Sequence, residues 1–154
     1  MRQIAVISFF ALLVPMTAAD PPGFVQWRSS ELKAYAKKLA PKINEQKLAL
    51  DQLGTFVKHA IVVVHREGNG EAEVHENLAD LFVVQDGQGT LVVGGKVVSP
   101  KQTQPGEIRG PSIQGGETKP LAPGDMVYIP TNLPHQVQVP AGKQITYVIV
   151  KLEK

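Results

Sequence analysis

Residues 70–87 read GEAEVHENLADLFVVQDG, and residues 124–135 read GDMVYIPTNLPH. The first stretch carries Glu73, His75 and Asp80, and the second ends on His135. Imidazole nitrogens and carboxylate oxygens are the ligands that divalent metals prefer. If both stretches lie on strands that line one cavity, we expect these four side chains to converge on a single metal ion.

The alternation of side chains supports such a cavity. In a strand, residues two apart point to the same face of the sheet. Two of the three faces run from polar to apolar, as expected for a cavity with a polar mouth and an apolar floor. The three faces are Glu73 with His75, Asp80 with Phe82 and Val84, and His135 with Val137 and Val139.

Short strands and glycine-rich turns dominate the pattern. The expected elements are a helix at Ser30–Leu39 and strands at 55–66, 71–76, 79–85, 126–129, 136–139 and 145–152. Segment 43–53 is ambiguous but suits an edge strand. Gly94 and Gly95 predict a two-residue hairpin between 90–93 and 96–98, because both turn positions favour positive φ. Residues 99–118, which hold three prolines and four glycines, predict a long loop. The pattern indicates a small all-β barrel or sandwich with one short helix packed outside.

Length and composition limit the possible functions. A chain of 154 residues predicts one domain, and 43% hydrophobic with 19% charged residues indicates an ordinary globular core. The chain has no cysteine, which excludes thiol catalysis and thiolate metal sites. A formal net charge of +2 gives no reason to expect nucleic acid. The cluster of Lys33, Lys37 and Lys38 predicts a solvated helix face instead.

The first nineteen residues have the pattern of a cleaved secretory signal peptide. A basic start at Arg2 precedes the apolar run Ile4–Val14, and small residues end at Ala19. The run is shorter than the roughly twenty residues that span a bilayer, so no permanent membrane span is expected. The alternative is an N-terminal strand or helix tucked into the domain. We expect a periplasmic or secreted protein with a signal peptide at 1–19, a linker and helix at 20–42, and a barrel domain at 43–154.

The two quoted stretches resemble the paired motifs of the cupin superfamily, in particular its small single-domain, cupin-2-like members. His75 matches the second histidine of the first motif, Asp80 stands at its glutamate position, and Gly87 is in register. In the second motif the sequence IPTNLPH, residues 129–135, matches the common I-P-x-x-x-P-H pattern in full. The resemblance implies a cupin-type antiparallel barrel, also called a double-stranded β-helix or jelly roll.

Three positions depart from the family pattern. Glu73 replaces the first histidine, Asp80 replaces glutamate, and Val139 stands where asparagine is often found. The usual set of three histidines and one glutamate becomes two histidines and two carboxylates. This harder set favours manganese, zinc or iron over copper, and export disfavours iron(II) because it oxidises outside the cytoplasm.

Each candidate ligand has an alternative interpretation. Glu73 is a metal ligand, a general base, or a solvent-facing residue at a strand start; Asp80 is a ligand or one methylene too short to reach the metal. His59 and His65 share strand parity with apolar residues and are expected to be core or rim histidines. Glu107 and Arg109 lie in the predicted loop. They are expected either to form a lid over the mouth of the cavity or to make a solvated ion pair.

Three functions remain open from the sequence. The first is a metal-dependent enzyme, an oxygenase, isomerase or lyase, that acts on a small molecule. The second is a module that binds a small ligand without turnover. The third is a metal-free enzyme in which a histidine–carboxylate pair transfers protons. A homodimer through a sheet edge, supplied by the strand candidate near Leu48, is also expected unless the helix caps that edge.

Overall fold

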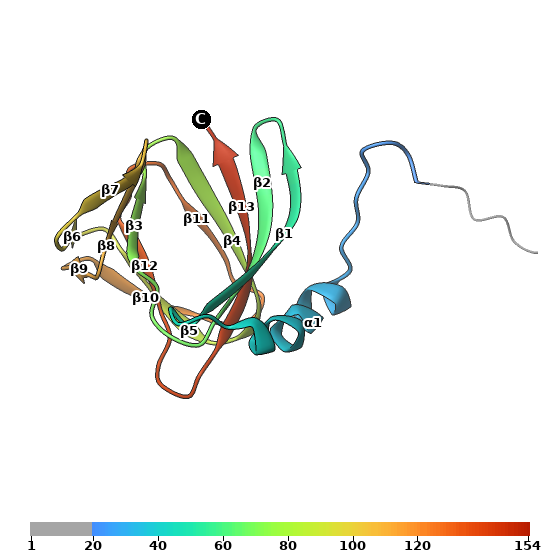
Figure 1. Cartoon of the computed structure of the whole chain (residues 1–154), viewed down its shortest axis with the longest axis horizontal. Coiled ribbons are helices and arrows are strands. Elements are labelled where there is room, and N and C mark those ends of the chain that lie inside the picture. Colours follow the sequence, from blue (N-terminus) through green and yellow to red (C-terminus); the bar gives the residue numbers. More distant parts are fainter. Residues whose placement is uncertain (1–19) are drawn as a thin grey trace, which may run out of the picture.

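Two antiparallel sheets face each other in the computed structural model, which describes residues 20–154 (Figure 1). The predicted signal peptide at 1–19 lies outside the described residues. The first sheet has the order β1-β2-β13-β4-β11. Its strands are β1 (Leu48–Phe56), β2 (His59–Arg66), β4 (Leu78–Gly87), β11 (Met126–Ile129) and β13 (Ile145–Glu153).

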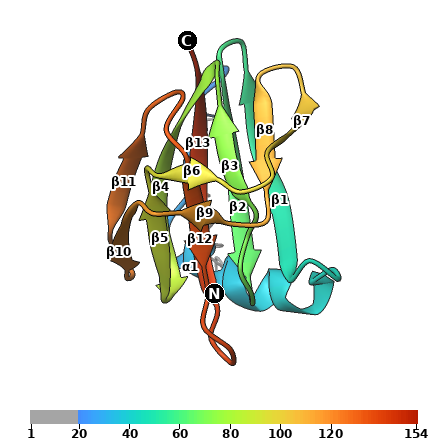
Figure 2. The same ribbon diagram turned by 90° about the vertical axis from the view of Figure 1, so that its left-hand side faces the viewer.

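The second sheet has the order β10-β5-β12-β3-β8-β7 and faces the viewer in Figure 2. Its strands are β3 (Ala72–His75), β5 (Gly89–Val93), β7 (Lys101–Gln104), β8 (Glu107–Gly110), β10 (Glu117–Leu121) and β12 (His135–Gln138). A two-stranded ribbon of β6 (Lys96–Val97) and β9 (Ile113–Gln114) crosses in front of it. Over residues 20–154, the strand-rich architecture with one helix ahead of the strands confirms the predicted fold class.

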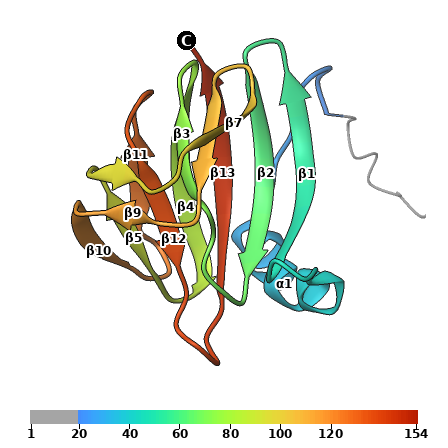
Figure 3. The same ribbon diagram turned by 60° about the vertical axis from the view of Figure 1, so that its left-hand side comes forward.

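One helix, α1 (Ser29–Leu39), packs on the outer face of the first sheet (Figure 3). Its apolar positions recur at helical spacing, and a short 3-10 turn at Ala40–Lys42, which contains Pro41, ends it. Leu39 is fully buried in a small core with Ala49, Val63 and Val148. The helix was predicted one residue shorter at its start. Among residues 20–154, no helix is both long enough and apolar enough to cross a bilayer.

The main core lies between the two sheets, on the inward faces that the alternation predicts. Phe82, Val84, Val137 and Val139 are each at most 5% exposed and belong to this core. Because the same faces begin with Asp80 and His135, the core forms the floor below the candidate ligands. The prediction of which side chains in these strands point inward is confirmed.

The prediction of one long strand at 55–66 is wrong. Residues 57 and 58 form a turn, and Phe56 pairs with His59 across a hairpin of β1 and β2. The turn is Val57-Lys58, which lacks the glycine or asparagine that usually signals a two-residue hairpin. The strand predicted within 43–53 is the first part of β1, and it lies at a sheet edge as expected.

The predicted hairpin at Gly94-Gly95 and the predicted loop at 99–118 are also wrong. Both glycines have positive φ, 75° and 72°, but β5 pairs with β10 and β12 while β6 pairs with β9. Residues 99–118 hold four strands or parts of strands rather than a loop. The prolines and glycines that suggested a loop instead punctuate short strands, as Gly106 does between β7 and β8.

Candidate metal centre

Three strands from the two sheets bring the predicted ligands together. Glu73 and His75 lie on β3, and Glu73 is the direct cross-strand partner of His135 on β12. Asp80 lies on β4 in the opposite sheet. All four side chains point between the sheets, and His75, Asp80 and His135 are at most 4% exposed. Residues far apart in the chain therefore meet in one buried cluster.

The ligand atoms approach one another closely. His75 Nε2 lies 3.2 Å from Asp80 Oδ2 and 3.5 Å from Glu73 Oε2. His135 Nε2 lies 3.7 Å and 3.9 Å from the same two oxygens. Glu73, His75 and His135 form a group whose ligand atoms all lie within 4.8 Å of one another. Asp80 contacts this group but is not a member of it.

The histidine rings are oriented by hydrogen bonds at Nδ1. His135 Nδ1 lies 3.0 Å from the Leu133 carbonyl oxygen, which only accepts, so Nδ1 carries the proton and Nε2 has a free lone pair. Nε2 of His135 is buried and has no hydrogen-bond partner among residues 20–154. His75 Nδ1 bonds to Glu107. A carboxylate or carbonyl behind each ring is the arrangement that metal-binding histidines use, so the residues present fit a divalent metal ion.

Strand β8 supplies the residues behind the ligands. Its register places Glu107 opposite His75 and Arg109 opposite Glu73. Arg109 Nη1 lies 2.8 Å from Glu73 Oε1, and Nη2 lies 2.6 Å from Glu107 Oε1. The sequence placed both residues in a loop, as a lid or a solvated pair. The structure instead makes them partly buried members of the network that holds the ligands.

Lys151 is the site residue that the sequence analysis missed. It lies opposite Asp80 in the pairing of β13 with β4, and its Nζ is 3.0 Å and 3.2 Å from the two Asp80 oxygens. Nζ is also 3.2 Å from His75 Nε2. The inward position of Lys151 could have been predicted. Lys151 shares strand parity with the buried Tyr147 and Ile149, so the alternation indicates that its side chain points inward.

Charges in the cluster shift several pKa values. Burial alone would lower the pKa of His75, but hydrogen bonds to Asp80, Glu107 and Glu73 raise it to about 10. His75 is then protonated at Nε2, and this proton points to a carboxylate. Because a protonated Nε2 cannot accept a hydrogen bond, Lys151 donates to Asp80 rather than to His75. Burial would raise the pKa of Glu73, but the bond from His75 and the charge of Arg109 lower it to about 2. Burial lowers the pKa of His135, which keeps its ring neutral.

The remaining two histidines lie outside the cluster, as expected. His65 is buried and lies 2.8 Å by its Nδ1 from the Thr146 hydroxyl. His59 stacks on Phe56 in the exposed hairpin, with ring centroids 4.6 Å apart. Neither residue is a member of the ligand group; of these two predicted core or rim histidines, His65 lies in the core, whereas His59 is exposed.

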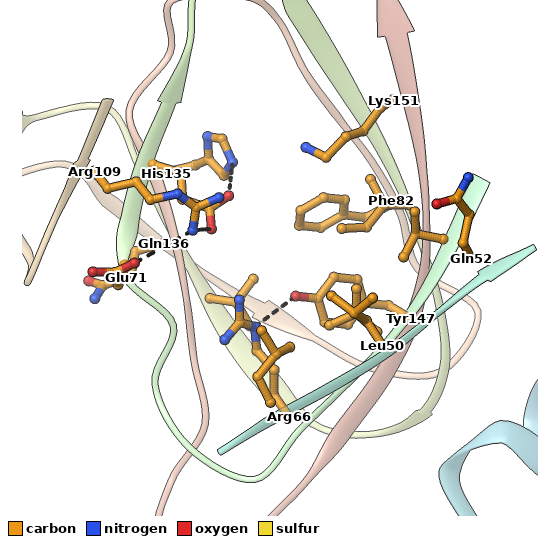
Figure 4. Close-up of a pocket in the computed structure, with 16 residues that line it drawn as sticks. Leu50, Gln52, Arg66, Glu71, Phe82, Arg109, His135, Gln136, Tyr147 and Lys151 are labelled. Atoms are coloured by element: carbon orange, nitrogen blue, oxygen red, sulfur yellow. Dashed lines mark hydrogen bonds and ion pairs between the residues drawn. The ribbon is translucent and has the colours of Figure 1, made fainter. Parts of the chain in front are cut away.

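A chamber of about 200 Å³ opens beside the cluster (Figure 4). Its walls are mainly apolar, from Val62, Val64, Phe82, Val137 and Ile149. His135 and Lys151 lie toward one end and Arg66 with Tyr147 toward another, and Glu73 also lines the chamber. The chamber can therefore hold a small molecule between a metal-binding end and a second polar end.

Solved structures with the same fold include proteins of very different sequence. The TT1209 protein of Thermus thermophilus matches with a TM-score of 0.55 and 19% identity, over 76% of this chain and 92% of that one. A cupin-2 domain protein of Rhodospirillum rubrum matches with a TM-score of 0.53 and 17% identity, over 71% of this chain and 62% of that one.

A third match is the DMSP lyase DddQ of Ruegeria pomeroyi DSS-3, with a TM-score of 0.51 and 15% identity over 70% of this chain. The match covers 48% of the lyase, so this chain spans about half of its length. No protein-family model and no curated protein matches the sequence. At these identities the likeness establishes the fold alone.

Proposed function

We propose that this chain, which has the cupin fold, binds one divalent metal ion through Glu73, His75 and His135 and uses it on a small molecule held in the chamber. The observation that carries the proposal is His135 Nε2, a buried nitrogen with a free lone pair and no partner among the described residues. Burying such an atom costs about 1–3 kcal/mol, which a metal–nitrogen bond would offset.

The donor set supports manganese, zinc or iron(II). Two imidazoles and one carboxylate leave coordination positions for a substrate oxygen or water, and Asp80 becomes a further ligand where Lys151 moves aside. When bound, the metal would polarise a substrate oxygen as a Lewis acid. The chain's own residues would orient the ligands from behind, through Glu107 and Arg109.

Glu73 is better suited to metal binding than to general-base catalysis. Its pKa of about 2 makes it a weak base near neutral pH, because a general base works best with a pKa near the operating pH. One of its oxygens is already paired with Arg109, and the other faces both histidines. This arrangement supports the role of ligand.

A second candidate function needs no metal. The ammonium of Lys151 lies within 3.2 Å of both Asp80 oxygens and of His75 Nε2, where it supplies a positive charge to the cluster. In that case His75, Asp80 and Lys151 would form a proton-transfer group for an acid–base reaction, or would serve a binding module. Metal analysis separates the two candidates.

The test is the metal content of chelated protein reloaded with manganese, zinc or iron(II), measured by elemental analysis after desalting. We expect about one equivalent for the wild type and for His59→Ala, a matched control in the exposed hairpin. His75→Ala and His135→Ala should each retain less than about a tenth of an equivalent. Less than about a tenth of an equivalent in the wild type, with every metal, would overturn the proposal in favour of the metal-free candidate.

Turnover is a separate question from metal binding. The fold hosts both enzymes and binding proteins, so a screen of the metal-loaded protein against small molecules distinguishes them. Product formation that His135→Ala abolishes would identify an enzyme. Saturable binding without product would identify a binding module.

Export is likewise a proposal from the sequence alone. It is tested by N-terminal sequencing of the protein recovered from its native host. A first residue at Asp20 agrees with cleavage of a signal peptide, and retention of Met1 contradicts it.

A further inference from the structure

We infer that the molecule bound in the chamber is a small carboxylate with an apolar body, and that Arg66 binds its carboxylate. This inference rests on the proposed function, because it assigns a ligand to the same chamber. Arg66 ends strand β2 on the inward face that begins with Val62 and Val64, and it lines the chamber with them. The sequence pattern alone does not indicate a role for Arg66.

Arg66 carries a positive charge without an acidic partner among residues 20–154. Its Nε donates a hydrogen bond to the Tyr147 hydroxyl at 3.1 Å, the contact drawn in Figure 4. Within the same described range, no carboxylate lies within ion-pair distance of its guanidinium, and its two terminal nitrogens make no hydrogen bond. Arg109 differs, because its terminal nitrogens are paired with Glu73 and Glu107. The unused edge of Arg66 matches the two oxygens of a carboxylate.

The guanidinium of Arg66 lies against a glycine that leaves room for it. A Cβ at Gly70 would lie 2.9 Å from Cζ and 3.0–3.1 Å from the two terminal nitrogens. Gly70 is itself fixed, since its N–H donates to the Val137 carbonyl at 2.8 Å and its carbonyl accepts from Gln136 at 2.8 Å. Gly70 and Tyr147 therefore hold the arginine in place before a ligand binds, which lowers the entropy that binding would cost.

The balance of charge also favours an anion. Around the chamber, four carboxylates exceed the permanent cations of Arg109 and Lys151 by two: Glu71, which pairs with Arg109 and also lines the chamber, Glu73, Asp80 and Glu107. A divalent metal with neutral histidines balances these charges, and Arg66 then leaves one net positive charge. A neutral ligand would leave that charge uncompensated inside a partly buried chamber.

The walls and the volume of the chamber indicate the polarity and the size of the rest of the ligand. Phe82 lies between Arg66 and Lys151 in Figure 4, and Val64 and Ile149 also line the chamber. Leu50, which is 57% exposed, stands at the rim. Apolar walls favour an aliphatic or aromatic body over a sugar, and a volume of about 200 Å³ suits a molecule of a few carbon atoms to one ring.

The inference is tested by calorimetric titration of the full chain with hexanoate and 3-phenylpropionate, and with their neutral amides. Each titration is run on metal-loaded and on chelated protein. We expect the carboxylates to bind at least about tenfold more tightly than the amides. Arg66→Gln should remove this preference while leaving metal content unchanged. Gly70→Ala, which displaces the guanidinium without changing its charge, should weaken carboxylate binding in the same direction.

Arg28→Gln serves as the matched control, because Arg28 is exposed at the start of α1, away from the chamber. Equal binding of carboxylates and amides, no binding of either carboxylate up to about 5 mM, or an unchanged preference in Arg66→Gln would each overturn the inference. Failure of the proposed function is distinguishable: the protein then takes up no metal, yet the preference for carboxylates that depends on Arg66 is still seen in chelated protein.

Discussion

At the scale of single residues, the direction in which His135 donates its proton decides what the cluster can do. The Leu133 carbonyl accepts from Nδ1, so Nε2 presents a lone pair to a space lined by His75, Glu73 and Asp80. The positive charge of Lys151 would oppose metal binding, since its ammonium contacts the same space. A metal ion bound by the proposed ligands would compete with this ammonium for the same space.

Lys151→Met should bind divalent metal about tenfold or more tightly than the wild type, because it removes a like charge next to the ligands and releases Asp80. The metal-free variant should be less stable, since Asp80 loses the cation that pairs with it in the interior. Metal affinity by calorimetry and thermal melting of chelated protein measure the two effects. Lys143→Met, at an exposed position, is the control. Weaker metal binding in Lys151→Met would contradict the competition.

The pH dependence of the chelated protein follows from two opposite pKa shifts. The pKa of Glu73 falls from 4.5 to about 2 on folding, so its contribution to stability is present above pH 4.5 and is lost as the pH falls through 2. The pKa of His75 rises from 6.5 to about 10, so its contribution is present below pH 6.5 and is lost as the pH rises through 10. Melting temperatures should be highest between about pH 4.5 and 6.5.

A variant of His75 tests which group causes the loss of stability at alkaline pH. In chelated His75→Gln, the decline in melting temperature between pH 6.5 and 10 should be reduced relative to the wild type. An identical decline in the two proteins would show that another group is responsible.

At the scale of elements, β8 holds the cluster in place. Its pairing with β3 sets Glu107 opposite His75 and Arg109 opposite Glu73, so one strand contacts two of the proposed ligands at once. Side chains directly opposite in an antiparallel pair lie on the same face and within contact distance. The geometry of the proposed ligands therefore depends on a strand that contributes none of them.

Glu107→Gln should weaken metal binding by about 10- to 100-fold, because the amide no longer fixes the His75 ring as a charged acceptor. Metal affinity by calorimetry is the measurement. Glu117→Gln, an exposed carboxylate on β10, should leave the affinity unchanged. Equal affinities in the two variants would show that β8 does not support the ligands.

Some elements of the site could be predicted from the sequence and others could not. Alternation in β3, β4 and β12 placed Glu73, His75, Asp80 and His135 on inward faces, because buried strands repeat with a fixed period of two. β8 was missed because glycines and prolines at 99–118 looked like a loop, and short strands with frequent turns have too few residues to show a period. The role of Lys151 depended on the pairing of β13 with β4, which alternation alone does not give.

For the molecule as a whole, residues 20–154 form two hydrophobic cores, and only one of them lies next to the candidate site. The larger core lies between the sheets beneath the ligands, and the smaller one lies between α1 and the outer face of the first sheet. The fold class was predictable, since its motifs and turns lie in order along the chain. The β1–β2 hairpin was not, because Val57-Lys58 has no turn signature. Dimer formation through the exposed edge at β1 stays a prediction.

Leu39→Ala should lower the free energy of unfolding by about 2–5 kcal/mol, because it opens a cavity in the core beneath α1. Metal affinity should not change, since this core lies on the far side of the first sheet from the ligands. Chemical denaturation and metal titration of the same variant measure both. Val57→Ala, at a side chain that is 96% exposed, should change stability by less than about 0.5 kcal/mol. A large loss of metal affinity in folded Leu39→Ala would show that the two cores are coupled.

The most direct test of the central claim is anomalous X-ray diffraction from crystals of the wild-type chain loaded with manganese or zinc, recorded at the absorption edge of the metal. We predict one anomalous peak within about 2.0–2.3 Å of Nε2 of His75, Nε2 of His135 and an oxygen of Glu73, with the Lys151 ammonium moved away from His75. Absence of a peak there, with Lys151 still in contact with His75 and Asp80, would contradict the claim that this cluster is a metal centre.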